Sequence, residues 1–173
     1  MKRIMLDTNI YEFILKYIEK DKIKDMIEKQ ILVIYGLNII RRELRDIPKD
    51  KIRIGEGKIH NLRVTLLSLY DFFVGSHQYK LTNEMSELAD KYYRVYKVLD
   101  GNAIKKEIIT DLIIVACASL HNLDIVVSED NKTMLSEKTI NAYKSVNTLE
   151  RIRSPLFIGF KKFVSVLRGV NFD

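Results

Sequence analysis

Four carboxylates in this chain stand at positions from which they could act together. Two apolar runs with the length of buried strands each end on an aspartate beside a hydroxyl residue, Asp7 in IMLDTN and Asp130 in IVVSED. Asp111 opens an apolar segment in ITDLIIVACA, and Glu43 in IIRRELRD follows two isoleucines at helical spacing. Carboxylates held close together repel and raise one another's pKa unless cations neutralise them. The pattern therefore favours an acidic, cation-binding site.

The available side chains indicate which cation would be bound. Mg²⁺ and Mn²⁺ prefer carboxylate and water oxygens, whereas zinc prefers imidazole or thiolate ligands. The three histidines, His60, His77 and His121, show no paired ligand spacing, and the single cysteine, Cys117, excludes a thiolate cluster and an internal disulfide. Cys117 lies in IVACASL, where a small buried core residue is expected rather than a nucleophile. The sequence therefore predicts an oxygen-only site.

Each of the four acids also has a purely structural explanation. Asp7 and Asp130 could cap the helices that follow them, Asp111 could be favoured by the dipole at a helix N-terminus, and Glu43 could pair with a neighbouring arginine. These explanations account for each acid singly. They give no reason why acids recur at one topological end of the strands, so both interpretations stay open.

Alternating strands and helices must position these acids. Apolar runs predict strands at 2–6, 31–36 and 124–128, with a short one at 145–148. Helical spacing predicts helices over 9–18, around 25–29 and from residue 37 to before Pro48. It also predicts a buried helix that starts at Asp111, a helix that follows the strand at 124–128 and runs to about residue 143, and a last helix within 156–168. Glu107 and Asp46 are the nearest substitutes if one acid is wrongly assigned.

This alternation indicates an α/β protein of three layers, with a mainly parallel sheet between helices. The middle differs: a charged connector at 49–57 leads to long helical patterns at 59–74 and 81–99, predicted as an antiparallel pair. We expect that pair, about 58–99, to elaborate a single domain spanning 1–173. If the first and third main strands are neighbours, Asp7 and Asp130 meet at the carboxyl edge of the sheet, where ligands bind.

In this order the motifs resemble the PIN domain, the nuclease domain of VapC-type toxins and of several RNA-processing enzymes. LDTN, RREL, TDLIIVACA and VVSEDN resemble its four successive motifs, and SVNTLERI resembles its last strand and helix. The resemblance implies a metal-dependent ribonuclease that hydrolyses RNA phosphodiester bonds. One or two Mg²⁺ or Mn²⁺ ions would be bound by the catalytic acids Asp7, Glu43, Asp111 and Asp130. The supporting residues would be Thr8, Asn9 and Ser128.

The resemblance also implies partners: an RNA substrate, a small antitoxin if the chain is a toxin, and a second copy in a homodimer. The span 48–100 is longer than in minimal toxins, so an RNA-processing PIN nuclease and a non-catalytic RNA-binding or partner-binding domain stay as alternatives. A phosphatase of the haloacid dehalogenase type also begins with an aspartate after its first strand. That family needs a second aspartate two residues later, where this chain has Asn9.

The charge of the chain suits a polyanionic substrate. Its 29 lysines and arginines exceed 23 acidic residues, for a net charge of +6, and a basic surface around an acidic pocket attracts phosphates. Five basic residues near two of the acids could hold an RNA backbone or form a solvated face: Arg41, Arg42, Arg45, Lys105 and Lys106. No aromatic-rich base-stacking motif is present, so no base preference is predicted. The strongest apolar stretch, 112–120, is about half the roughly 20 residues that span a bilayer, and we expect a soluble, cytoplasmic protein.

Overall fold

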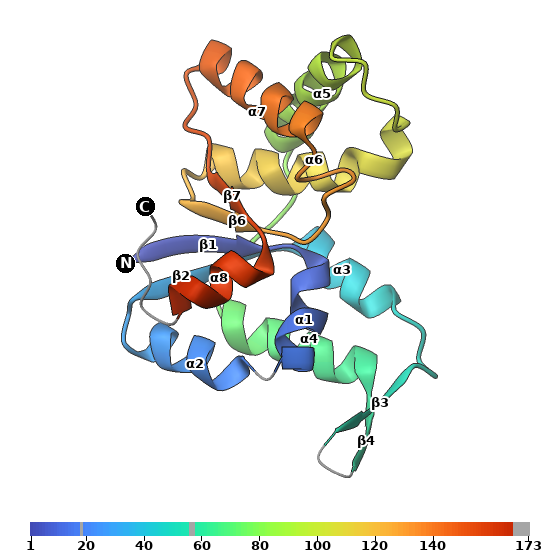
Figure 1. Ribbon diagram of the computed structural model, residues 1–173, viewed down its shortest axis with the longest axis vertical. Helices are drawn as coiled ribbons and strands as arrows, with labels where there is room; N and C mark the ends of the chain where they lie inside the picture. Colours follow the sequence, from blue (N-terminus) through green and yellow to red (C-terminus); the bar gives the residue numbers. More distant parts are fainter. Residues whose placement is uncertain (18, 56–57, 168–173) are drawn as a thin grey trace.

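The computed structural model describes residues 1–17, 19–55 and 58–167, and five of its strands form one parallel sheet (Figure 1). These strands are β1 (Lys2–Leu6), β2 (Leu32–Leu37), β5 (Gln78–Tyr79), β6 (Ile125–Val127) and β7 (Leu156–Ile158). Their spatial order is β5-β2-β1-β6-β7, and every neighbouring pair is parallel. The predicted α/β fold with a mainly parallel sheet is confirmed.

Helices cover both faces of this sheet (Figure 1). One face carries α1 (Thr8–Tyr17), α2 (Lys20–Glu28), α3 (Asn38–Asp46) and α4 (Leu62–Val74), and α8 (Phe160–Leu167) returns to contact α2. The other face carries α5 (Asn83–Val98), α6 (Lys105–Leu120) and α7 (Glu137–Glu150). The chain builds outward from β1 to β2 and β5, then returns to the other side of β1. Because parallel crossovers are right-handed, this reversal moves the helices to the opposite face.

The strand order reverses between β1 and β6, which lie side by side with Leu6 opposite Val127. The neighbouring position that we assumed for these two strands is therefore observed. The N–H of Asp7 extends the ladder by donating to the carbonyl of Val127 at 2.9 Å. In parallel α/β sheets, ligands bind beyond the carboxyl ends of the strands at such a reversal.

The core lies on both sides of the sheet, so its central strands are apolar throughout. Ile4, Met5 and Leu6 of β1 are at most 1% exposed, as expected for strands covered on two faces. Cys117 in α6 is fully buried, and burial raises the pKa of its thiol to about 12, which keeps it protonated and unreactive. Within the described residues no helix is both long and apolar enough to cross a membrane.

The two long helices predicted in the middle of the chain exist, but they do not pack as an antiparallel pair. α4 packs against α3 and β2, whereas α5 packs against α6 and α7 on the opposite face of the sheet. Between them lies β5, an edge strand that pairs with β2. Its two residues are too few to show an alternating pattern, which is why the sequence did not reveal the crossing.

Two boundaries near this region also differ from the prediction. The described part of the connector at 49–57 includes β3 (Ile52–Gly55), which pairs in antiparallel orientation with β4 (Lys58–Asn61). The helix predicted from residue 59 therefore begins at Leu62, where the side chain of Asn61 caps it by accepting the N–H of Val64 at 3.1 Å. Residues 18, 56 and 57, which the predictions included, lie outside the described residues.

The strand predicted at 145–148 is wrong, because α7 continues through it to Glu150. Four residues with one buried apolar side chain fit either period, and here the helix prevails. Arg151, in the left-handed region at φ 56°, ends the helix. The last strand is instead β7, and the helix predicted within 156–168 is confined to α8, with residue 168 outside the described residues.

Candidate functional site

Asp7 links β1 to α1, and both of its carboxylate oxygens accept hydrogen bonds. Oδ1 accepts the N–H of Thr8 at 2.7 Å, while Oδ2 accepts the hydroxyl of Ser128 at 2.6 Å and the amide of Asn9 at 2.8 Å. The residue is only 5% exposed. Asp7 therefore bonds the first turn of α1 and at the same time faces the end of β6.

Ser128, the residue after β6, joins Asp7 to the loop that carries Asp130. Its fully buried hydroxyl donates to Asp7 and accepts the N–H of Asp130 at 3.0 Å. Asn9 contributes a second link, since its Oδ1 accepts the N–H of Glu129 at 3.3 Å. The side chains of Ser128 and Asn9 thus bridge the ends of β1 and β6.

Thr133, which no sequence pattern singled out, connects two further acids. Its hydroxyl contacts Oδ2 of Asp111 and, at 2.6 Å, Oδ2 of Asp130. The other oxygen of Asp130 accepts the N–H groups of Lys132 at 2.9 Å and Thr133 at 2.8 Å, which folds the loop around the carboxylate. An aspartate that follows a strand is a turn residue, because its side chain bonds the backbone N–H two residues later, as Asp130 does with Lys132. This signal marks the loop but not the contact of Thr133 with Asp111.

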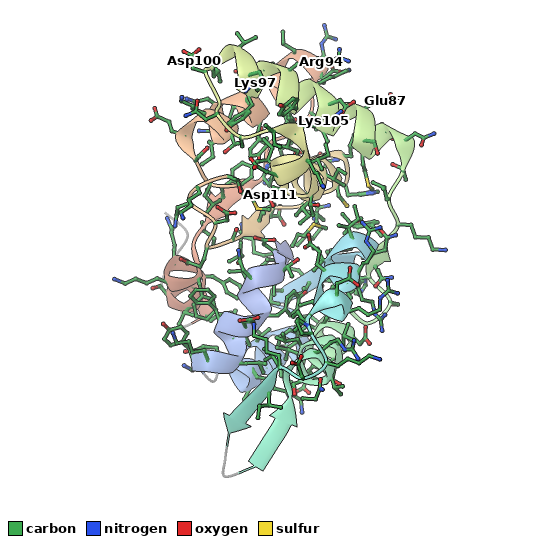
Figure 2. The ribbon with its side chains drawn as sticks, turned by 90° about the vertical axis from the view of Figure 1, so that its right-hand side faces the viewer. Glu87, Arg94, Lys97, Asp100, Lys105 and Asp111 are labelled. Atoms are coloured by element: carbon green, nitrogen blue, oxygen red, sulfur yellow. The ribbon has the colours of Figure 1, made fainter. Side chains whose placement is uncertain are left out.

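Asp111 lies in the second turn of α6 and not at its start, because the helix begins at Lys105. Figure 2 looks onto the carboxyl edge of the sheet and shows Asp111 near the centre, between the upper helical layer and α1. The first turn of α6 is closed by Glu107 instead, whose Oε2 accepts the N–H of Ile104 at 3.1 Å. The helix-terminus explanation for Asp111 is therefore wrong.

Glu43 extends from α3 toward α1, where the hydroxyl of Thr8 donates to its Oε2. No ion pair between Glu43 and an arginine is found among the described residues. The neighbouring Arg41 turns away and donates two hydrogen bonds to Asp71 of α4, at 2.8 and 2.9 Å. The alternative explanation of Glu43 as the partner of a neighbouring arginine is not supported.

Burial and mutual repulsion disfavour the charged forms of two of the acids. Burial is the main cause that raises the pKa of Asp7 to about 6 and that of Asp111 to about 7. Repulsion from Glu43 and Asp130 adds to both shifts. For Asp130, burial acts in the same direction, but hydrogen bonds from Thr133 and the loop N–H groups outweigh it and lower its pKa. The four acids therefore lie within electrostatic range of one another.

Three of these acids, Asp7, Asp111 and Asp130, line an open pocket of about 380 Å³, whereas Glu43 is not among its lining residues and reaches it through Thr8. Its lining comes from the β1–α1 junction, the end of α3, α6 and the loop after β6, and it comprises Asp7, Thr8, Asn9, Glu12, Phe13, Ile47, Asp111 and Asp130. Elements distant in the sequence thus supply one acidic pocket at the reversal point of the sheet. We refer to it below as the acidic pocket.

The donor set of the acidic pocket suits a hard divalent cation, because it consists of oxygen atoms only. The raised pKa values of Asp7 and Asp111 point the same way, since a bound cation would favour their charged forms. As the side chains stand, no three His, Cys, Asp or Glu residues within 1–17, 19–55 and 58–167 are arranged to hold a metal ion. Binding would require the carboxylates to exchange some hydroxyl contacts for the cation.

The substitutes considered for the acids lie elsewhere. Asp46 ends α3 with an exposed side chain, 3.8 Å from Arg45, and Glu107 is engaged at the start of α6. Among the basic candidates, Lys105 is 2.8 Å from Asp90 and is seen above Asp111 in Figure 2. Two candidates are exposed and form no ion pair in the described part of the chain, Arg42 and Lys106.

Comparison with known proteins supports the fold. One similar solved structure is the crystal structure of VapBC2 from Rickettsia felis bound to a DNA fragment from their promoter, with a TM-score of 0.53 and 15% sequence identity. The similarity covers 91% of this chain and 98% of the matched chain. No protein-family model and no curated protein matches the sequence. Fold and site together define a three-layer α/β protein with an acidic pocket at the reversal point of its sheet.

Proposed function

We propose that this protein is a metal-dependent ribonuclease that hydrolyses RNA phosphodiester bonds. Asp7, Glu43, Asp111 and Asp130 would bind one or two Mg²⁺ or Mn²⁺ ions. The observation that carries the proposal is the gathering of four electrostatically coupled carboxylates, from four separate segments, at the point where ligands bind in parallel α/β sheets. A cluster of this kind is costly for the protein unless it binds cations.

The side chains of the pocket have distinct roles in this proposal. When bound, the ions would supply a water of lowered pKa and stabilise the charge that develops on the phosphate. Ser128 and Asn9 hold Asp7 between β1 and β6, and Thr8 orients Glu43. Thr133 keeps the carboxyl groups of Asp111 and Asp130 together. Pre-positioned ligands lower the reorganisation that cation binding requires.

We further propose that the protein is the toxin of a VapBC-type toxin–antitoxin pair, held inactive by a small antitoxin and able to dimerise. The fold that it shares with a chain of the VapBC2 structure supports this proposal. An RNA-processing nuclease that is not a toxin would use the same pocket. A non-catalytic RNA-binding or partner-binding domain is favoured by one observation, that no three of the acids and histidines described are arranged as metal ligands.

The decisive experiment is cleavage of labelled single-stranded RNA in Mn²⁺ or Mg²⁺, with and without a chelator. Asp7→Asn should abolish cleavage, whereas the matched control Asp46→Asn, at an exposed acid outside the acidic pocket, should leave it unchanged. Cleavage that survives both chelation and Asp7→Asn would refute the mechanism. Binding of RNA without cleavage in either metal would favour the non-catalytic alternative.

A further inference from the structure

Three aromatic side chains from the two ends of the chain form a cluster beside the acidic pocket. Phe13 and Tyr17 lie on α1, and Phe160 begins α8. Their ring centres are 6.1 Å apart for Phe13 and Tyr17, 5.5 Å for Phe13 and Phe160, and 5.6 Å for Tyr17 and Phe160. They line a groove of about 480 Å³. We call it the aromatic groove, defined by these three residues.

The aromatic groove is continuous with the acidic pocket along α1. Asn9, Phe13 and Tyr17 are spaced by four residues and therefore share one face of the helix. Asn9 bonds to Asp7, and Phe13 lines both the acidic pocket and the aromatic groove. Eight helical residues cover about 12 Å, a distance that a short stretch of single-stranded RNA can span. A strand with one phosphate in the acidic pocket would reach these rings.

The two carboxylates that line the aromatic groove already have partners. Glu129 accepts the N–H of Phe160 at the start of α8. Glu19 lies 2.9 Å from the ammonium group of Lys22. The charge of Glu19 is therefore compensated by a lysine, and it opposes a polyanion less than an unpaired carboxylate would. Glu129 keeps its negative charge but is held at the start of α8 by the hydrogen bond from Phe160.

Two lysines border the aromatic groove without an acidic partner in the described part of the chain. The ammonium group of Lys16 is 5.4 Å from the ring centre of Tyr17, and Lys161 lines the groove at the start of α8. Tyr17 is itself 51% exposed, so part of its ring is accessible to a ligand. Exposed aromatic faces flanked by cationic groups are the features with which proteins bind single-stranded nucleic acid.

We propose that the aromatic groove binds an unstacked base of single-stranded RNA whose scissile phosphate occupies the acidic pocket. Lys16 and Lys161 would contact the adjoining phosphates. The identity of the occupant rests on the ribonuclease proposed above. Because every base has an aromatic face, stacking tolerates many sequences, and the site would select unpaired RNA over duplex without selecting one base.

A fluorescent reporter tests this directly, because the chain contains no tryptophan. Tyr17→Trp places a single tryptophan in the aromatic groove. Phe72→Trp is the matched control, since Phe72 on α4 is 52% exposed and also has two lysine ammonium groups near its ring, at 6.0 and 5.9 Å. Each variant is mixed in Mg²⁺ with single-stranded RNA or with inorganic polyphosphate of equal charge, and fluorescence is followed during binding, before turnover.

RNA should quench the tryptophan at position 17 and leave the one at position 72 unchanged, and polyphosphate should quench neither. Equal quenching at both positions, quenching by polyphosphate, or RNA binding without quenching at position 17 would overturn the proposal. A concentration-dependent blue shift at position 17 without RNA would mean that a second copy of the chain covers the groove, which would also overturn it.

Cleavage kinetics separate this inference from the ribonuclease proposal. Tyr17→Leu keeps apolar volume but removes the stacking face, and the KM for RNA should rise roughly tenfold or more. Phe72→Leu, outside the groove, should retain the wild-type KM, and Tyr17→Phe, which keeps the ring, should recover most of the KM that Tyr17→Leu loses. Thermal unfolding checks that each variant is folded. RNA cleavage with an unchanged KM in Tyr17→Leu would refute the stacking site alone. Quenching of the tryptophan at position 17 without any cleavage would refute the ribonuclease alone.

Discussion

At the residue scale, hydroxyl groups hold the acids of this site in place. Each of the four carboxyl groups forms a hydrogen bond with the hydroxyl of Thr8, Ser128 or Thr133. A hydroxyl carries one proton, so Thr133 cannot donate to two ionised carboxylates at once. With the pKa of Asp111 raised to about 7, the arrangement is the one expected when at least one carboxyl is protonated.

The raised pKa values predict how stability depends on pH without metal. Asp7 and Asp111 have pKa values of about 6 and 7 when folded, against 3.8 ordinarily. The stability that they contribute is fully present below about pH 4 and is lost as pH rises through about 6 to 7, because the folded state must release protons that the unfolded state has already lost. The difference in the free energy of unfolding between Asp7→Asn and the wild type, measured by urea unfolding with a chelator, should shift in favour of the variant by on the order of 1 to 3 kcal/mol between about pH 4 and about pH 8.

Asparagine cannot ionise, so the variant lacks the part of the pH dependence that Asp7 contributes. Asp46→Asn serves as the control, because its exposed carboxylate lies outside the acidic pocket. A constant difference between wild type and Asp7→Asn across this pH range would contradict the assignment.

Metal should stabilise the folded protein through the same carboxylates. A ligand present at about 100 times its Kd stabilises the folded state by roughly 2.7 kcal/mol. Mn²⁺ should therefore raise the Tm of the wild type and of Asp46→Asn, and a chelator should reverse the change. Asp7→Asn should show little or no shift. A shift of equal size in all three proteins would place the ion outside the acidic pocket.

At the element scale, the loop after β6 is organised around one aspartate. Asp130 and Thr133 close this loop through side-chain and backbone hydrogen bonds, and the hydroxyl of Thr133 ties the loop to α6 through Asp111. α6 precedes β6 in the chain and the loop follows it, so the two segments meet beside the same strand. Their junction therefore decides how closely two of the acids approach.

Thr133→Val keeps the shape of the side chain but removes the hydroxyl. Loss of the partner of two partly buried carboxyl groups should destabilise the protein by about 1 to 3 kcal/mol, measured by chemical denaturation at about pH 5 with a chelator. Thr133→Ser retains the hydroxyl and should recover most of that loss. If serine and valine destabilise equally, the hydrogen bonds do not contribute and packing of the methyl group explains the effect.

At the scale of the whole molecule, the chain carries a net charge of +6, but its basic side chains are not equally available to a polyanion. Lys105 is paired with Asp90, while the adjacent Lys106 is exposed and without an ion pair in the described part of the chain. Lys105 and Lys106 can therefore be compared directly, as a paired and an unpaired lysine at adjacent positions. Phosphate contacts should come from the unpaired charges.

Lys106→Gln, alone or with Arg42→Gln, should weaken RNA binding and flatten its dependence on salt. The slope of log K against log salt should change by about 0.7 for each phosphate that the variant no longer neutralises. Lys105→Gln should have a smaller effect, because its ammonium group is already paired with Asp90. Fluorescence anisotropy of labelled RNA at several salt concentrations provides the measurement. Equal effects of Lys105→Gln and Lys106→Gln would show that the pairing does not limit binding to phosphate.

Local features of the sequence were sufficient for much of the fold. Strands buried on both faces appear as continuous apolar runs, so β1, β2 and β6 were predicted nearly in place, and Asp7 and Asp130 were visible as residues that follow strands. The short strand β5 and the extension of α7 over 145–148 were not predictable, because a few residues fit more than one period.

The sequence by itself therefore determined the buried strands β1, β2 and β6, the existence of the longer helices and which acids follow strand ends, since periodicity and chain order lie in consecutive residues. Only the tertiary structure decided which segments meet. The position of β6 beside β1 brings Asp130 toward Asp7, and β5 sends α4 and α5 to opposite faces. The return of α8 after β7 places Phe160 against the rings of α1. These contacts join residues distant along the chain, and the order of the sheet strands, which no local pattern encodes, fixes them.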